Sequence, residues 1–84
     1  MIKVLYFARL RETLGISGEE LDWTPDTVTV ASLMVLLSAR GDVWQQQFDG
    51  FRPLRAAVNQ TLVPNSATIK AGDEVAFFPP VTGG

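Results

Sequence analysis

A single strong helical repeat lies near the middle of this sequence. It consists of apolar residues at positions i, i+3, i+4 and i+7, namely Val30, Leu33, Met34 and Leu37. Thr29 stands directly before the repeat and is a residue type that caps helix N-termini, whereas Gly41 stands where a glycine commonly ends a helix. Because an amphipathic helix needs an apolar surface to cover, we expect this helix to pack on a sheet.

Strand-like stretches lie on both sides of this helix. Residues 2–8 carry apolar side chains in both alternating sets except at Lys3, which favours a central strand that is covered on both faces. Residues 9–18 are polar and interrupted by glycines, so we expect a loop there. The alternating or apolar pattern predicts further strands at residues 19–23, 54–59, 61–63 and 74–78, with a tight turn at Asn59–Gln60.

A shorter helical piece is expected after Gly41. Asp42 is a residue type that caps helices, and Trp44 and Phe48 supply an apolar side at helical spacing. The resulting order is strand, strand, helix and then strands, which is typical of the α+β class rather than of repeated βαβ units. A chain of 84 residues is suited to one domain, with the last strand expected in the middle of its sheet.

The composition excludes several classes of function. Cysteine and histidine are both absent, so disulfides, a thiolate nucleophile, the usual zinc ligands and the commonest general base are excluded. The net charge of −2 and the scattered basic residues argue against nucleic acid as a partner. The longest apolar stretch, Val30 to Leu37, is much shorter than the ~20 residues that span a bilayer. We therefore expect a cytoplasmic protein with no membrane contact.

The C-terminal end differs in character from the rest of the chain. Pro79–Pro80 cannot donate hydrogen bonds to a sheet, so the last strand is expected to stop at Phe78. This divides the chain into a domain of residues 1–78 and a flexible tail of residues 79–84. Gly83 and Gly84 lack Cβ atoms, which leaves the terminal carboxyl sterically bare and able to enter a narrow channel. Glycine-rich chain ends are also common without any function.

Three segments resemble a known family. They are the end Asp73-Glu74-Val75-Ala76-Phe77-Phe78-Pro79-Pro80-Val81-Thr82-Gly83-Gly84, the segment Ala56-Ala57-Val58-Asn59-Gln60, and the start Phe7-Ala8-Arg9-Leu10-Arg11-Glu12. Together they resemble the small subunits of molybdopterin synthase, which belong to the ubiquitin-like β-grasp sulfur carriers. The resemblance covers essentially the whole chain, and its terminal segment is far more specific than a Gly-Gly pair alone. It implies a mixed sheet packed on one main helix, with a projecting Gly-Gly tail.

The resemblance also implies how the chain works. Gly84, preceded by Gly83, would be adenylated by an E1-like adenylyltransferase that uses ATP in trans, and a sulfur donor protein would then convert it to a thiocarboxylate. The thiocarboxylate would deliver its sulfur inside the large subunit of molybdopterin synthase, to build the dithiolene of the molybdenum cofactor in a heterotetramer. An acyl-adenylate has a good leaving group, which a free carboxylate lacks. This chain is then expected to bind no cofactor or metal and not to be catalytic alone.

Candidate docking residues surround the base of the tail. Phe7 and Phe78 lie at the ends of predicted strands, Arg11 is suited to pair with a carboxylate, and Pro79 begins the tail. Phenylalanine on a strand is also typical of a core, and an arginine in a loop is often only solvated. The remaining tail residues expected to contact a partner are Pro80, Val81 and Thr82.

Other functions are compatible with parts of this pattern. A sulfur carrier for another pathway, such as thiamine or an amino acid, would share the Gly-Gly chemistry. A ubiquitin-like binding module with an inert tail, or a small enzyme, are the alternatives from other classes. Sulfur on the C-terminal peptide separates a carrier from a module, and catalysis by the isolated chain would favour an enzyme.

Overall fold

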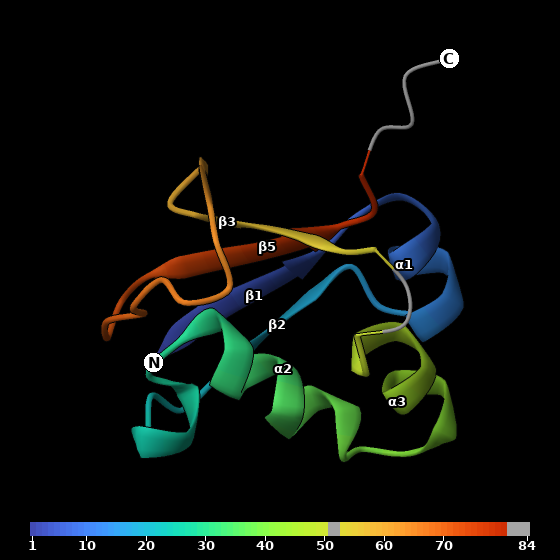
Figure 1. Cartoon of the computed structure of the whole chain (residues 1–84), viewed down its shortest axis with the longest axis horizontal. Coiled ribbons are helices and arrows are strands. Elements are labelled where there is room, and N and C mark those ends of the chain that lie inside the picture. Colours follow the sequence, from blue (N-terminus) through green and yellow to red (C-terminus); the bar gives the residue numbers. More distant parts are fainter. Residues whose placement is uncertain (51–52, 81–84) are drawn as a thin grey trace.

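The computed structural model describes residues 1–50 and 53–80 (Figure 1). These described residues form a five-stranded sheet, three α-helices and one short 3-10 helix. In chain order the elements are β1 (Ile2–Tyr6), α1 (Ala8–Leu14), β2 (Gly18–Leu21), η1 (Pro25–Thr27), α2 (Val30–Ser38), α3 (Asp42–Phe48), β3 (Arg55–Val58), β4 (Thr61–Val63) and β5 (Glu74–Phe78). This confirms the α+β class.

The sheet is mixed, with the strand order β2-β1-β5-β3-β4. The first and last strands, β1 and β5, pair in parallel, and the other neighbours are antiparallel. The last strand therefore lies in the middle of the sheet, as the sequence predicts. Asn59 and Gln60 both have positive φ, of 50° and 69°, and form the predicted tight turn between β3 and β4.

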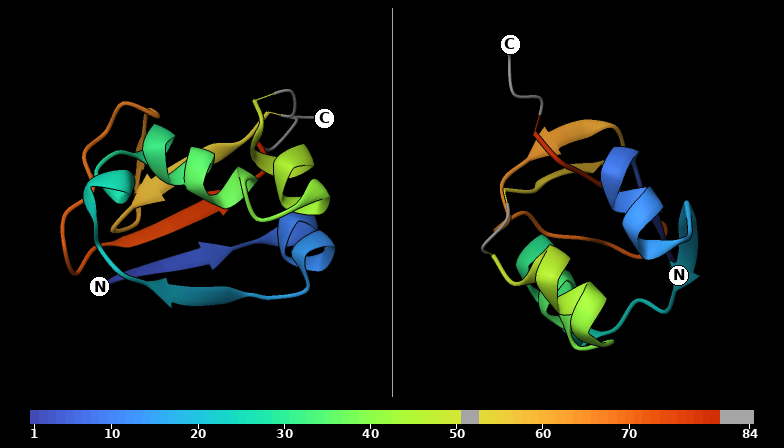
Figure 2. Two further views of the ribbon diagram at one scale, coloured as in Figure 1. Left: turned by 90° about the horizontal axis from the view of Figure 1, so that it is seen from below. Right: turned by 90° about the vertical axis from the view of Figure 1, so that its right-hand side faces the viewer.

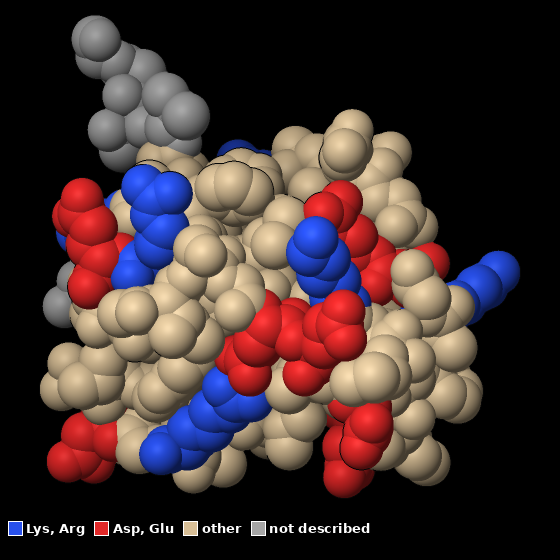
Figure 3. All heavy atoms as spheres, turned by 180° about the vertical axis from the view of Figure 1, so that it is seen from behind, with Lys and Arg blue, Asp and Glu red and all other residues tan. Residues whose placement is uncertain are grey.

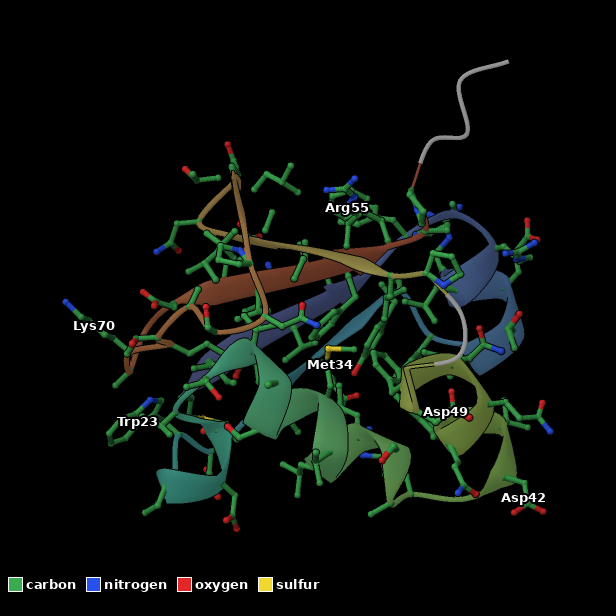
Figure 4. All side chains as sticks on the ribbon, viewed as in Figure 1. Trp23, Met34, Asp42, Asp49, Arg55 and Lys70 are labelled. Atoms are coloured by element: carbon green, nitrogen blue, oxygen red, sulfur yellow. The ribbon has the colours of Figure 1, made fainter. Side chains whose placement is uncertain are left out.

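The main helix, α2, covers one face of the sheet (Figure 2). Leu33 and Leu37 are fully buried against a core that includes Val4, Val75 and Phe77. The predicted N-cap is confirmed, because the Thr29 hydroxyl accepts a hydrogen bond from the Ser32 amide at 3.1 Å. The Ser32 hydroxyl in turn accepts a hydrogen bond from the Thr29 amide. In Figure 4, Met34 points from α2 toward the sheet.

Helix α2 ends earlier than the sequence predicts. Its C-cap is Ala39, and Gly41 instead serves as the N-cap of α3, with a φ of 146° that favours glycine. Asp42, expected as the cap of that second helix, is its first helical residue. Phe48 and Trp44 supply the predicted apolar side, since Phe48 is buried and Trp44 packs on the core.

The loop expected at residues 9–18 is largely a helix, α1. Leu10 is buried and Leu14 packs against the core one turn later, which gives this polar segment an apolar side of its own. Gly15 ends the helix in the left-handed conformation, with its amide donating to the Arg11 carbonyl at 2.9 Å. Leu10 followed four residues later by Leu14 and then by a glycine is the signal that could have identified this helix.

Candidate protein-docking site

The ends of β1 and β5 bring Phe7 and Phe78 together. The register pairs Tyr6 with Phe77, and the Phe7 amide donates to the Phe77 carbonyl at 3.1 Å. Tyr6 and Phe77 are fully buried, so side-chain alternation places Phe7 and Phe78 on the opposite face of the sheet. Phe7 is 44% exposed and Phe78 is half-buried. The two predicted aromatic residues therefore share one surface.

A row of apolar residues continues from these aromatics across the sheet. The register places Leu5 beside Ala76, Ala76 beside Ala57, and Ala57 beside Leu62. We call this row, together with Phe7 and Phe78, the outer face. Leu62 is 57% exposed, and the helices α2 and α3 lie on the other side of the sheet (Figure 2). Strand β1 is thus central, but the prediction that it is covered on both faces is wrong for the described residues.

The predicted arginine, Arg11, lies on α1 rather than in a loop. Its side chain is exposed, and its amide donates to the Phe7 carbonyl at 3.4 Å. A second arginine, Arg55, is paired in register with Phe78 and points away from α2 and α3 in Figure 4. On the face shown in Figure 3, acidic and basic side chains are intermixed rather than gathered by sign.

The described part of the tail, Pro79–Pro80, is called here the tail root. It follows β5 directly, leads away from α2 and α3 in Figure 1, and is half-buried. The strand stops at Phe78 as predicted. Beside the tail root is a pocket of about 330 Å³ lined by Ala8, Arg9, Pro53, Pro79 and Pro80. The other predicted tail residues, Val81, Thr82, Gly83 and Gly84, lie outside the described residues.

The titratable groups with shifted pKa values are found elsewhere. Burial, and then a hydrogen bond to Glu19, raises the pKa of Tyr6. Burial opposes ionisation of Glu19, but hydrogen bonds from Arg40 and Tyr6 outweigh it and lower the pKa of that carboxyl. Arg40 also lies 4.7 Å from the ring centre of Trp44. These groups satisfy one another on the helical side of the sheet, so we assign them to structure rather than to catalysis.

Two kinds of functional feature are absent from the described residues. Within residues 1–50 and 53–80, no group of three or more Asp or Glu side chains is placed to hold a metal ion. In the same part of the chain, no helix is long and apolar enough to cross a membrane. What the described site offers is an apolar face ending at two prolines, which is a surface suited to contact with another protein.

The two aromatic residues of the outer face are predicted from the sequence, whereas its other residues are not. Leu5, Ala57, Leu62 and Ala76 were assigned to strands without regard to the face they share. The available signal was alternation, because Ala57 and Ala76 are small apolar residues at positions where an exposed strand usually carries polar side chains.

Comparison with known proteins places the chain among related sequences and folds. The profile of the ThiS family matches residues 4–84. The molybdopterin synthase sulfur carrier subunit of Escherichia coli is 48% identical over 84 residues, and that of Haemophilus influenzae is 42% identical, each over 100% of both chains. The crystal structure of small archaeal modifier protein 1 of Haloferax volcanii has a TM-score of 0.76 at 26% identity, covering 95% of this chain and 97% of that chain. These similarities confirm the expected ubiquitin-like β-grasp fold.

Proposed function

The chain belongs to the ThiS family, with the molybdopterin synthase sulfur carrier subunits, and we propose that it carries sulfur as a thiocarboxylate on Gly84. The observation that carries this proposal is the full-length similarity to two such subunits, together with a family match that extends through Gly84. A tail that begins at two prolines on the rim of an apolar face supports it, because docking of that face sets the direction in which the tail enters a partner.

The chemistry proceeds in two steps. In the first, the Gly84 carboxylate attacks ATP held by an adenylating partner, forming an acyl-adenylate and releasing pyrophosphate. In the second, hydrosulfide supplied by a donor protein attacks the acyl carbonyl, displaces AMP and leaves the thiocarboxylate. This chain contributes the acyl group and the docking surface, so ATP and its metal are bound in trans. Gly83 keeps the approach to the reacting carbonyl free of a side chain.

The thiocarboxylate then reacts inside the large subunit of molybdopterin synthase, where it supplies sulfur for the dithiolene of molybdopterin. Holding the sulfur on a positioned peptide replaces a bimolecular encounter, an effect worth ~7–11 kcal/mol in favourable cases. The outer face and the tail root are the docking surface for this subunit, and the complete synthase is a heterotetramer. We further propose that this cycle takes place in the cytoplasm.

The test is the mass of the protein after incubation with the adenylating partner, ATP and a sulfur donor. We expect the intact mass to rise by the difference between one sulfur and one oxygen atom, with the change located on the C-terminal peptide. Deletion of Gly84, or addition of one residue after it, abolishes the change because the reactive carboxyl is lost or displaced.

The control is the fold of the shortened protein, which circular dichroism and urea unfolding should show to be unchanged, because residue 84 follows the two prolines that end the sheet. A binding module with an inert tail predicts no mass change in the wild-type protein. Sulfur transfer by the variant without Gly84 would refute the proposal.

A further inference from the structure

Among the described residues that line the pocket beside the tail root, Arg9 is the one with a charged side chain. The other walls of the pocket are Ala8, Pro53 and the two prolines of the tail root. Proline has no N–H, so three of the five lining residues offer no backbone donor. Among these described lining residues, the guanidinium of Arg9 is therefore the dominant hydrogen-bond donor.

The backbone holds Arg9 at this position by an abrupt turn. Strand β1 stays paired with β5 up to the hydrogen bond from the Phe7 amide to the Phe77 carbonyl. The next residue, Ala8, has a φ of 55°, in the left-handed region that residues with a Cβ rarely adopt. The chain then enters α1 at once, so Arg9 lies at the end of the sheet and against the tail root instead of continuing along β1.

Arg9 has no acidic partner within the described part of the chain. Its side chain is exposed, and among residues 1–50 and 53–80 the salt bridge between Arg40 and Glu19 is the one that forms. The protein as a whole has a net charge of −2, so its overall charge does not attract an acidic partner. An acidic group that approaches the tail root is therefore attracted by the local positive charge of Arg9 and not by the overall charge of the protein.

We propose that this pocket receives an Asp or Glu side chain of the protein that takes up the tail, and that Arg9 binds its carboxylate. A planar guanidinium satisfies both oxygens of a carboxylate with two parallel hydrogen bonds, and the proline walls fit the apolar part of the side chain. A phosphate would retain further oxygens for which the described lining residues offer no second charged donor. The inference rests on the proposed function, because it assumes that a partner surrounds the tail.

The position of the pocket gives this contact a specific role. Pro79 directly follows Phe78, so the pocket continues the outer face at the point where the tail leaves the domain. An ion pair at the rim of an apolar interface mainly affects the association rate and the orientation of docking. Arg9 is thus a positioning residue that aligns the tail with the entrance of the partner.

The experiment measures association of the full chain with the molybdopterin synthase large subunit by stopped-flow at several salt concentrations. Arg9→Glu is compared with Lys70→Glu, which makes the same charge change at the opposite end of the molecule (Figure 4). At low salt we expect Arg9→Glu to weaken binding about tenfold, mostly through the association rate, and Lys70→Glu to change it less than about twofold. Added salt should make the difference in binding between these two variants smaller, because it screens the charges. Arg9→Lys, which keeps the charge but not the planar fork, is expected to lie between wild type and Arg9→Glu.

Two results would overturn the inference. One is that Arg9 proves to have no specific effect on binding. This would be seen if Arg9→Glu bound as well as the wild-type protein, or if Arg9→Glu and Lys70→Glu lost equal binding affinity. The other is saturable binding of inorganic phosphate that shifts the Arg9 side-chain NMR signal, because the pocket would then be an anion site. The Gly84 deletion is assayed in parallel for sulfur transfer. Retained transfer there refutes the proposed function, whereas normal binding by Arg9→Glu with Gly84 still required refutes the role of Arg9 alone.

Discussion

Ala8 is the residue at which this chain departs most clearly from ordinary backbone geometry. Its φ of 55° lies in the left-handed region, where a Cβ atom is unfavourable, and no glycine relieves it. Such a residue costs of order 1–3 kcal/mol and persists where the surrounding structure fixes it. Here the hydrogen bond between Phe7 and Phe77 on one side and the buried Leu10 on the other fix the turn.

Replacing Ala8 by glycine tests whether this turn is strained. Ala8→Gly removes the left-handed penalty and should raise the free energy of unfolding by about 0.5–1 kcal/mol, after the greater entropy of glycine in the unfolded chain is counted. Ala31→Gly, at an exposed position of α2, is the matched control and should lower that free energy by about 1 kcal/mol. Urea unfolding measures both. A loss of stability in both variants would show that Ala8 is not strained.

At the scale of elements, a polar network ties the link between α2 and α3 to the sheet. Arg40 donates to both oxygens of Glu19 on β2, at 2.7 and 2.9 Å, and the Tyr6 hydroxyl on β1 donates to the same carboxylate at 2.7 Å. Tyr6 and Trp44 meet edge to face with ring centres 5.6 Å apart. The link between α2 and α3 is therefore fastened to the two strands at one edge of the sheet.

This network makes stability depend on pH. The pKa of Glu19 in the folded protein is below its ordinary value. Its contribution to the free energy of unfolding is therefore complete above the unfolded pKa of about 4.3, and is lost as the pH falls through the pKa of the folded protein. Glu19→Gln should therefore cost about 1–2 kcal/mol at neutral pH, and less in acid. Urea unfolding at neutral and acidic pH measures this. Glu20→Gln, at the exposed neighbour, is the control, and a pH-independent cost for Glu19→Gln would contradict the assignment.

Much of this element structure could be predicted from local pattern, and the failures have physical causes. Residues 61–63 and 74–78 form strands with the predicted limits, and Thr29 caps α2, because each of these signals is local. Helix α1 was missed because seven mostly polar residues form a helix only where Leu10 finds a core. The outer face could not be predicted because Leu5 meets Ala76, and Ala76 meets Ala57, only through the pairing of strands distant in sequence.

At the scale of the whole molecule, the two faces of the sheet have different roles. One face is buried under α2 and α3 and holds the core. The outer face keeps small and apolar residues although no described helix covers it, and it ends at the tail root. A small domain buries only a limited number of apolar side chains in its core. An apolar row that remains uncovered therefore indicates a surface that binds a partner.

A pair of aspartate substitutions on opposite sides of the molecule tests this division. Leu62 is 57% exposed on the outer face and Val35 is 69% exposed on α2, so either change should alter stability by no more than about 0.5 kcal/mol. Leu62→Asp should weaken binding to the large subunit about tenfold or more, because it places a charge in an apolar contact. Val35→Asp should leave binding unchanged. Calorimetric titration measures both affinities, and equal effects would mean that the partner does not dock on the open side of the sheet.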